Sequence, residues 1–481
     1  MSLTVRAAEY AANLAPARLP PEVREKARQA LRDHLACTLA GSQTDLGRMV
    51  RETLAAGVDG PAALVGAERG TAPGLAAYCN ATAANALDCD DTSSAGHPGA
   101  SLIPAALAAA AVQGCSGATL LAAVVAGYEV GMRVARAIRP SWQRYRQVHG
   151  IGSAQVFGAA AAAGRVLGLD PEQMARAFGI AGATAPVAHA GKFGWDERPL
   201  GWVKDNCAWP AEAGLRAALL ARAGFPASRS ILDGDTGFWV MAGSDQFDPS
   251  HLEDYSQYRL LGLSFKPYPC CRWLHTTLDA LARLQSQRGF TADDVLWVRV
   301  DAIQPLAELF ADPAPRTMVD AQFSVPHAVA MQLLGVPIER WWRPENRTEL
   351  TVVDLMGKVQ VAHDPTLTEL YLARGRHNGI IPARVRVALR AGGVGEAYEE
   401  VATGEPSRAL SEEAQLDKFH RLAGLAWPLG RRQDLLRLLA ELEALPSASQ
   451  LLEVLLLVQQ RHARGGGQTS ASTPVRYGEG S

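Results

Sequence analysis

The sequence predicts a mainly α-helical protein with an α+β insertion, in which both chain ends form one all-helical domain and the insertion forms a lid domain. Helical patterns follow one another over residues 1–263, alternating strand patterns appear within residues 264–403, and helical patterns return over residues 404–463. At 481 residues, the chain is also too long for one ordinary compact core.

The helical patterns have regular start and stop signals and are rich in small residues. The stretch "PPEVREKARQALRDHLACTLAG" begins with proline, repeats apolar residues at helical spacing and ends in glycine. Similar patterns recur in "SGATLLAAVVAGYEVGMRVARAI", "SAQVFGAAAAAGRVLG", "DPEQMARAFGIAGATA" and "WPAEAGLRAALLARAG". Helices with so much alanine and glycine are expected to pack closely, and one that is apolar nearly all round should be central.

The inserted segment mixes strand and helix patterns. Apolar and polar residues alternate in "DDVLWVRVDA", "ARVRVALRA" and "AYEEVATG", which is typical of strands. Between these stretches, "FSVPHAVAMQLLG" and "LTVVDLMGKV" indicate helices. The last residues, 464–481, are rich in glycine, serine and threonine with little to bury, so we expect a disordered tail.

Composition excludes several classes of partner. A formal charge of −2 gives no reason to expect binding to nucleic acid or to an anionic membrane surface. The first residues lack a basic segment followed by an apolar one, and the alanine-rich runs are too short to span a bilayer convincingly. We therefore expect a cytoplasmic protein whose partner is a small molecule, with no nucleic acid and no membrane.

The common cofactor and nucleophile motifs are missing from the sequence. In "HGIGSAQVFG", Gln155 occupies the third glycine position of a dinucleotide fingerprint, and no strand precedes it. The P-loop, zinc-protease and serine-elbow patterns do not occur. The seven cysteines lack the spacing of a zinc or iron–sulfur site, and a redox role for adjacent Cys270 and Cys271 is not expected because vicinal disulfides are strained.

The most polar break between two helical runs is "ALDCDDTSSAGHPGAS". It places Asp88, Asp90, Asp91, Thr92 and His97 within ten residues. Such a stretch is either a helix-capping loop at the surface, since Asp, Thr and Ser favour caps, or a place where protons are transferred. A calcium loop is not indicated, because the spaced ligands and the closing glutamate are missing.

Several further side chains are candidates for proton transfer or anion binding. His149 in "QVHGIGS" precedes a helix, where it is either a catalytic group or a surface cap. Lys204 lies between tryptophans and either binds an anion or extends its amine to solvent. Near two prolines in "SFKPYPCCRWLHTTLDAL", the cations Lys266 and Arg272 suit a carboxylate ligand or mark a domain hinge.

Two more histidines complete the set of candidates. His275 follows the two cations, and His327 in "AQFSVPHAVA" begins a helix, where a packing role is the alternative. Together, the histidines, acids and cations are what a metal-free enzyme needs to move a proton next to a carboxylate: a base, an acid for a leaving hydroxyl, and cations for the charge that develops.

Five motifs in order resemble the MmgE/PrpD family. They are "ALDCDDTSSAGHPGASLIPAALA", "HGIGSAQVFGAAAAAGRVLGLD", "GWVKDNCAWPAEAGLRAALLARAGF", "FKPYPCCRWLHTTLDAL" and "DAQFSVPHAVAMQLLG", and the resemblance runs from about Val5 to about Ala463. This family includes 2-methylcitrate dehydratase, cis-aconitate decarboxylase and iminodisuccinate epimerase. The resemblance implies a helical domain with an α+β lid, a homodimer, and a site between the domains that uses no metal and no organic cofactor.

The family's site residues fall on matching positions of this chain. They are Asp88, Thr92, His97, His149, Lys204 and Lys266. The chain departs from the decarboxylase member at two positions that matter for its proton delivery, where a histidine is replaced by Cys271 and a tyrosine by His327. These departures weigh against cis-aconitate decarboxylation.

From the residues and the resemblance together, we expect a lyase resembling 2-methylcitrate dehydratase that acts on a small hydroxylated di- or tricarboxylate. The expected catalytic residues are His97, His149, Asp88 and Thr92, and the expected substrate-binding residues are Lys204, Lys266, Arg272, Cys271, His275 and His327. Alternatives are an epimerase or isomerase of a dicarboxylate, a cis-aconitate-type decarboxylase, and a non-catalytic binding protein with the same fold.

Overall fold

The fold is described from a computed structural model of the chain. The described residues are 2–67, 69–93, 96–148, 151–186, 197–201, 206–375 and 378–456. The predicted disordered tail and two predicted site residues, His149 and Lys204, lie outside these ranges.

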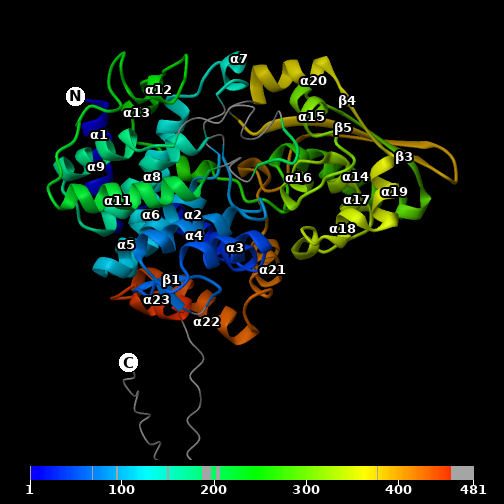
Figure 1. Cartoon of the computed structure of the whole chain (residues 1–481). Helices are drawn as coiled ribbons and strands as arrows, with labels where there is room; N and C mark the ends of the chain where they lie inside the picture. The colour runs from blue at the N-terminus through cyan, green and yellow to red at the C-terminus, as the bar shows by residue number, and fades with distance from the viewer. Residues whose placement is uncertain are drawn as a thin grey trace, which may run out of the picture.

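Helices from both ends of the chain form one body, drawn at the left of Figure 1. Its N-terminal helices are α1 (Leu3–Asn13), α2 (Pro21–Gly41), α3 (Asp45–Leu54), α4 (Pro73–Asn85), α5 (Pro98–Gln113), α6 (Gly117–Ala137), α7 (Trp142–Tyr145), α8 (Ile151–Val166), α9 (Pro171–Ala183), α11 (Ala208–Arg222), α12 (Phe238–Met241) and α13 (Ser250–Glu253). Its C-terminal helices are α21 (Glu412–Ala423), α22 (Leu429–Ala440) and α23 (Ser449–Leu456). Because α21 packs on α2, the two ends of the chain share one hydrophobic core.

The centre of this body consists of α5, α6 and α8, whose small residues allow close approach as the sequence predicts. A Cβ atom on Gly127 of α6 would lie 2.9 Å from the carbonyl oxygen of Gly158 in α8. Helix α6 is long and apolar enough to cross a membrane, and 83% of its apolar window is buried inside the fold. A buried core helix of a globular protein has the same properties, and a cytoplasmic location stays a prediction.

The second part of the structure is a four-stranded mixed sheet with helices packed on it. The strands are β3 (Val295–Ala302), β4 (Val359–His363), β5 (Ile380–Leu389) and β6 (Val394–Val401), in the order β4-β3-β5-β6. Only β3 and β4 run parallel. The helices are α14 (His275–Arg288), α15 (Gln304–Leu309), α16 (Met318–Gln322), α17 (Val325–Leu333), α18 (Glu345–Thr348), α19 (Leu350–Gly357) and α20 (Pro365–Leu370).

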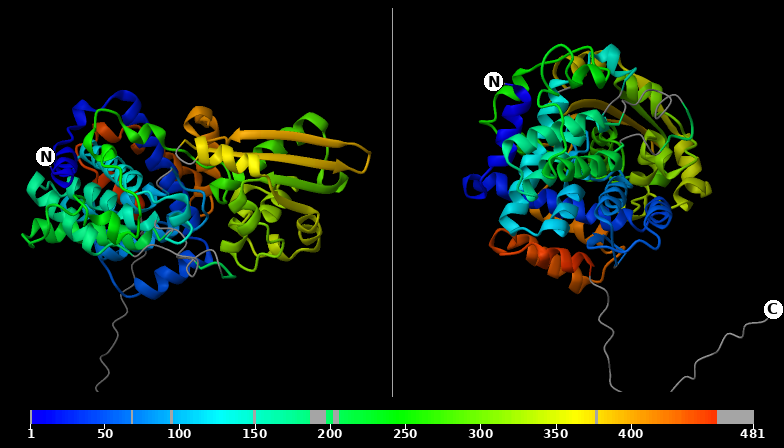
Figure 2. Two further views of the ribbon diagram at one scale, coloured as in Figure 1. Left: turned by 90° about the horizontal axis from the view of Figure 1, so that it is seen from above. Right: turned by 60° about the vertical axis from the view of Figure 1, so that its left-hand side comes forward.

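This second part, which we call the lid, has its own hydrophobic core. It forms a separate lobe in the view from above in Figure 2. The mainly helical fold with an α+β part agrees with the sequence prediction, whereas the domain boundaries stay predictions. Strand β4 was not predicted, and neither was the short hairpin of β1 (Ala62–Leu64) and β2 (Arg69–Thr71) in the helical body. Strands β1 and β2, with three residues each, contain too few residues for an alternating pattern to be recognised.

The chain passes between the helical body and the lid at two neighbouring points. The backbone N–H of Phe265, entering the lid, donates to the carbonyl oxygen of Gly404, on the way back, over 3.1 Å. Gly404 has a φ of +96°, and a Cβ atom there would lie 2.0 Å from the Phe265 oxygen. Both the conformation and the close approach therefore require glycine at this junction.

Substituting Gly404→Ala should lower the free energy of unfolding by about 1 to 3 kcal/mol, because alanine is strained at this φ and its Cβ displaces the Phe265 carbonyl. The matched control is Gly357→Ala at the end of α19, where no atom lies within 4 Å of the added Cβ. Urea unfolding of both variants tests this difference. Equal stability of the two variants would contradict the close approach at residue 404.

Candidate active site

The polar stretch between α4 and α5 is buried in the structure. None of Asp88, Asp90, Asp91, Thr92 and His97 is more than 7% exposed. Helix α4 ends at Asn85 and α5 begins at Pro98, and these five residues of the connecting segment lie inside the protein. This burial excludes a solvent-exposed capping loop, which was the alternative interpretation of the sequence. Buried carboxylates require charged or hydrogen-bonding partners.

Lys266 is the first of these partners. Its Nζ atom lies 2.6 Å from Oδ1 of Asp88 and also donates to the Asp88 carbonyl oxygen over 2.8 Å. Asp88 can face the lysine with both groups because its backbone is left-handed, with a φ of 51°. Burial alone would lower the pKa of Lys266, but the carboxylates of Asp88 and Asp90 outweigh burial and raise this pKa above its ordinary value. Lys266 is therefore charged in this site.

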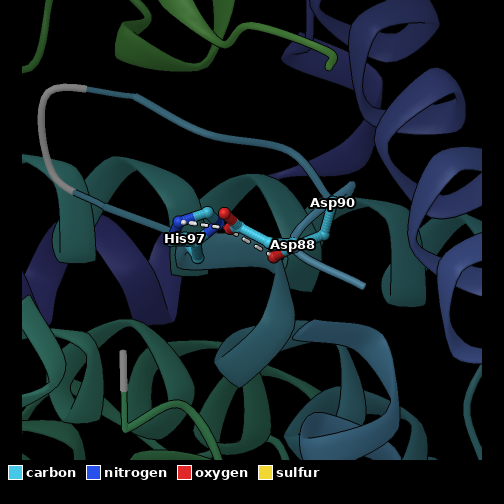
Figure 3. A group of neighbouring side chains, drawn as sticks. All are labelled: Asp88, Asp90 and His97. Carbon is cyan, nitrogen blue, oxygen red and sulfur yellow. Dashed lines mark hydrogen bonds and ion pairs between the residues drawn. The ribbon is translucent and has the colours of Figure 1, made fainter. Parts of the chain in front are cut away.

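His97 lies between the carboxylates of Asp88 and Asp90, as Figure 3 shows. Its Nδ1 atom is 3.1 Å from Oδ2 of Asp90, and its Nε2 atom is 3.6 Å from Oδ1 of Asp88. Asn85, the last residue of α4, donates from Nδ2 to Oδ1 of Asp90 over 3.0 Å and fixes that carboxylate. A carboxylate on Nδ1 keeps the proton there and leaves Nε2 as the atom that can exchange a proton.

Asp91 points to a different set of partners. The Gly99 backbone N–H and the Tyr128 hydroxyl each donate to Oδ2 of Asp91 over 3.2 Å. Burial raises the pKa of Asp91 to about 7, and the neighbouring carboxylates of Asp90 and Asp33 add to this effect. Asp91 thereby anchors the loop to α5 and α6, and it does so with a proton bound over much of the acidic range.

A second buried lysine supports the loop from the C-terminal helices. Lys418 of α21 donates to Oδ1 of Asp33 in α2 over 2.5 Å and to the carbonyl oxygen of Cys89 over 2.7 Å. Sequence analysis missed this residue. The available signal was a lysine adjacent to Phe419 and four residues before Leu422, on the buried face of a helix.

The polar loop is joined to the segment that leads into the lid by backbone hydrogen bonds. Thr92 and Ser264 exchange backbone hydrogen bonds of 3.0 and 2.9 Å, while the Thr92 hydroxyl donates to the Gly96 carbonyl over 3.1 Å. The Ser264 hydroxyl donates over 2.7 Å to Glu405, which also accepts from Arg272 over 3.2 Å. Ser264, Arg272 and Glu405 line a cavity of about 340 Å³ between the helical body and the lid. Glu405 was not predicted, because it is far from the other residues in the sequence.

The structure brings Asp88, His97 and Lys266 together and gives other predicted residues different partners. His275 has Nε2 3.1 Å from the Cys270 carbonyl, and burial lowers its pKa well below the ordinary value. His327 has Nε2 3.0 Å from the Asn346 carbonyl inside the lid, and burial lowers its pKa to about 4. The backbone N–H of Cys271 donates a hydrogen bond to the Gln322 carbonyl. The Cys271 side chain contributes to the raised pKa of Lys266.

The loop also contains a possible cation site. Asp88, Asp90 and His97 each offer one ligand atom, and these atoms lie within 4.8 Å of one another. The ammonium group of Lys266 already supplies a positive charge to Asp88, and Asn85 and His97 occupy the oxygens of Asp90. The oxygens of Asp88 and Asp90 therefore already have the Lys266 ammonium group, the Asn85 amide and the His97 ring as partners, and this arrangement suits those side chains better than a metal ion. The absence of a metal cofactor stays a prediction.

Substituting Lys418→Met should lower the free energy of unfolding by about 3 to 5 kcal/mol, because it leaves the buried Asp33 without its cation. The matched control is Lys358→Met, which removes a lysine 2.7 Å from the mostly exposed Asp354 and should cost about 0 to 1 kcal/mol. Urea unfolding measures both values. A Lys418→Met protein as stable as the control would refute this role of the buried lysine.

The wild-type protein should lose stability relative to Asp91→Asn as the pH rises from about 4 to about 7. The folded chain keeps a proton on Asp91 up to about pH 7, whereas the unfolded chain releases it near 3.8. Since the folded state binds more protons in this window, the free energy of unfolding falls with rising pH, by at most about 1.4 kcal/mol per pH unit.

Urea midpoints at pH 5, 6 and 7 for wild type and Asp91→Asn measure this difference. The control is Asp293→Asn, which changes an exposed aspartate and should follow the wild-type pH dependence. Parallel pH profiles for wild type and Asp91→Asn would show that Asp91 holds no proton in the folded state.

Comparison with known proteins identifies the chain's family. The MmgE/PrpD N-terminal domain matches residues 5–250, and the MmgE/PrpD C-terminal domain matches residues 268–443. A cis-aconitate decarboxylase of Aspergillus terreus is 26% identical over 486 residues, which cover 94% of this chain and 96% of that protein. The cis-aconitate decarboxylase of Homo sapiens is 26% identical over 401 residues, covering 80% of this chain and 79% of its own. The chain therefore belongs to the MmgE/PrpD family and is an enzyme of the lyase class.

Proposed function

We propose that the chain is a cofactor-independent hydro-lyase that removes water from a small hydroxylated di- or tricarboxylate, in the manner of 2-methylcitrate dehydratase. The proposal is supported above all by one contact: Lys266, on the segment that enters the lid, meets Asp88 of the buried polar loop, and Asp88 in turn lies beside His97. Ser93 and Ser264, close to these residues in the chain, line a cavity. Elimination of water next to a carboxylate requires a base, an acid and a fixed cation, and Asp88, His97 and Lys266 include all three kinds.

In the proposed reaction, His97 exchanges a proton through Nε2, since Asp90 holds Nδ1. A base takes the proton from the carbon next to a carboxylate, and a C=C bond forms as the C–O bond to the hydroxyl breaks. An acid protonates the departing hydroxide, so that water leaves and no electrons are gained or lost. His149, outside the described residues, is the second group that we assign to this acid–base pair.

Cations hold the carboxylates of the substrate in this scheme. Lys266 stabilises the negative charge that develops when the proton leaves, and Asp88 keeps the ammonium group in place. Arg272 lines the cavity and holds a second carboxylate. Lys204, which lies outside the described residues, is assigned to carboxylate binding from the sequence. Thr92, whose hydroxyl donates to the Gly96 carbonyl, shapes the loop next to Ser93, which lines the cavity.

Decarboxylation of cis-aconitate is the second candidate, because the relatives compared above bear that name. It uses the same kinds of group but breaks a C–C bond and delivers a proton to carbon. Two residues weigh against it in this chain. Cys271 and His327 stand where the resemblance leads us to expect a histidine and a tyrosine, and Nε2 of His327 is near a lid carbonyl. An epimerase of a dicarboxylate remains a third alternative, since it needs no leaving group.

The deciding experiment incubates the purified protein with 2-methylcitrate, citrate and cis-aconitate and follows the products by proton NMR. The proposal predicts an unsaturated acid from a hydroxylated acid, with no release of carbon dioxide. Release of carbon dioxide from cis-aconitate would support the decarboxylase instead. Exchange of a substrate proton with D₂O, without either product, would support the epimerase.

Substituting His97→Gln should lower the turnover number for the accepted substrate by about 100-fold or more, because glutamine can bond Asp90 but transfers no proton. The matched control is His363→Gln, which changes a histidine at the exposed end of β4. Both variants should melt within a few degrees of the wild type. Unchanged turnover in folded His97→Gln would remove His97 from the mechanism.

A further inference from the structure

The cavity next to the buried loop contains an unusual concentration of arginines. Arg136, at the end of α6, and Arg259, in the 3-10 turn Arg259–Gly262, line it from the helical body, and Arg272 lines it from the lid. Ser93, which follows Thr92 in the polar loop, is part of the same lining. A second cavity of about 680 Å³ shares the lining residues Arg136 and Asn378 with the first.

Two of these arginines lack the partners that their neighbours have. Among the described residues, the guanidinium groups of Arg136 and Arg259 make no ion pair or hydrogen bond, and the Nε atoms of both are buried. By contrast, Arg133, about one turn earlier in α6, pairs with the Glu129 carboxylate, and Arg272 pairs with Glu405. Among the described arginines that line this cavity, Arg136 and Arg259 therefore differ from Arg272 in lacking an acidic partner.

Among the described residues, the acidic groups around the pair have other partners. Glu129 accepts from the Arg133 side chain and from the Arg259 backbone N–H, and Asp254, which interacts electrostatically with Arg259, accepts from Ser256. Burial lowers the pKa of Arg136, and repulsion from Arg259 lowers it further. Asp248 is the carboxylate that faces Arg136, but it accepts hydrogen bonds from Ser250, and His251 lies 3.5 Å from it. Two like charges held together in a partly desolvated cavity are costly unless an anion neutralises them.

We propose that Arg136 and Arg259 form a carboxylate-binding pocket that holds the terminal carboxylate of a polycarboxylate substrate. This inference rests on the proposed function and adds the groups that determine specificity. Lys266 supplies one cation at the reacting end, and Ser264, two residues earlier in the chain, lines the arginine cavity and pairs with Thr92 of the polar loop. In this proposal, the far end of the same substrate lies in the arginine cavity. The planar fork of arginine suits bidentate contact with a carboxylate. The pocket therefore selects substrates with at least two carboxylates.

Isothermal titration calorimetry of the full chain tests the pocket without requiring turnover. The probes are tricarballylate, which has three carboxylates and no hydroxyl to eliminate, propionate, which has one carboxylate, and inorganic phosphate. Arg136→Gln and Arg259→Gln should each weaken tricarballylate binding about ten- to hundred-fold and should leave propionate binding unchanged. The matched control is Arg176→Gln in α9, which changes a surface arginine paired with Glu172 and should bind like the wild type.

Arg136→Lys and Arg259→Lys serve as second variants, because they keep the charge and lose the fork. Intermediate weakening of tricarballylate binding supports the proposal, and it does so even where a glutamine variant fails to fold. Unchanged tricarballylate binding in the folded variants overturns it, and so does a wild-type protein that binds no tricarballylate. Wild-type affinity for phosphate equal to that for tricarballylate, lost in the same variants, also overturns it, in favour of a phosphate site.

Turnover measurements separate this inference from the proposed function. Where the wild type turns over a hydroxylated tricarboxylate, the glutamine variants should raise KM about ten-fold or more and change kcat much less. Wild-type turnover with unchanged KM in both variants refutes the pocket and leaves the proposed reaction in place. Arginine-dependent binding of tricarballylate, without dehydration of any hydroxylated acid, supports the pocket and refutes the reaction.

Discussion

The contact between Lys266 and Asp88 is the interaction on which the rest of the site depends. It connects the segment by which the chain enters the lid to the polar loop between α4 and α5, and both side chains are almost completely buried. A buried ion pair of this kind forms only where further hydrogen bonds support each partner. The left-handed backbone of Asp88, the Thr92–Ser264 pairing and the Phe265–Gly404 bond all serve to place these two groups together.

Charge compensation extends outward from that contact. Asp88 is balanced by Lys266, and Asp33 by Lys418, whose ammonium group also holds the Cys89 carbonyl. His97 faces the carboxylates of Asp88 and Asp90. A bound proton neutralises Asp91 below about pH 7, because burial raises its pKa. The helical body supplies this scaffold from both ends of the chain, while the lid contributes Arg272 and its partner Glu405 to the cavity wall. A rigid, charge-balanced loop beside a cationic cavity suits acid–base chemistry on anionic substrates.

Sequence reasoning found the residues that lie within single motifs and missed those that meet across long separations. Asp88 and His97 were recognised because a polar stretch interrupts two apolar helical runs, and Lys266 because it lies near Arg272 and two prolines; the family resemblance pointed to all three. Lys418 and Asp33 are 385 residues apart and lie on helices that look ordinary by themselves. His327 was predicted to bind substrate, but its Nε2 lies next to the Asn346 carbonyl inside the lid. A histidine at the start of a helix gives no sign in the sequence of such a neighbour. The mainly helical class was predictable from periodicity, but the three-residue strands β1 and β2 were too short to give a pattern.

The reverse reaction, addition of water to the unsaturated acid, shows whether the buried polar loop takes part in eliminating water from a polycarboxylate. The unsaturated acid is incubated in H₂¹⁸O with wild type and with Asp88→Asn, and the hydroxylated acid is examined by mass spectrometry. Our account predicts ¹⁸O in the hydroxyl group with wild type and at least about 100-fold slower incorporation with Asp88→Asn, which weakens the hold on Lys266. Equal incorporation by the two proteins, or loss of carbon dioxide without incorporation, would contradict it.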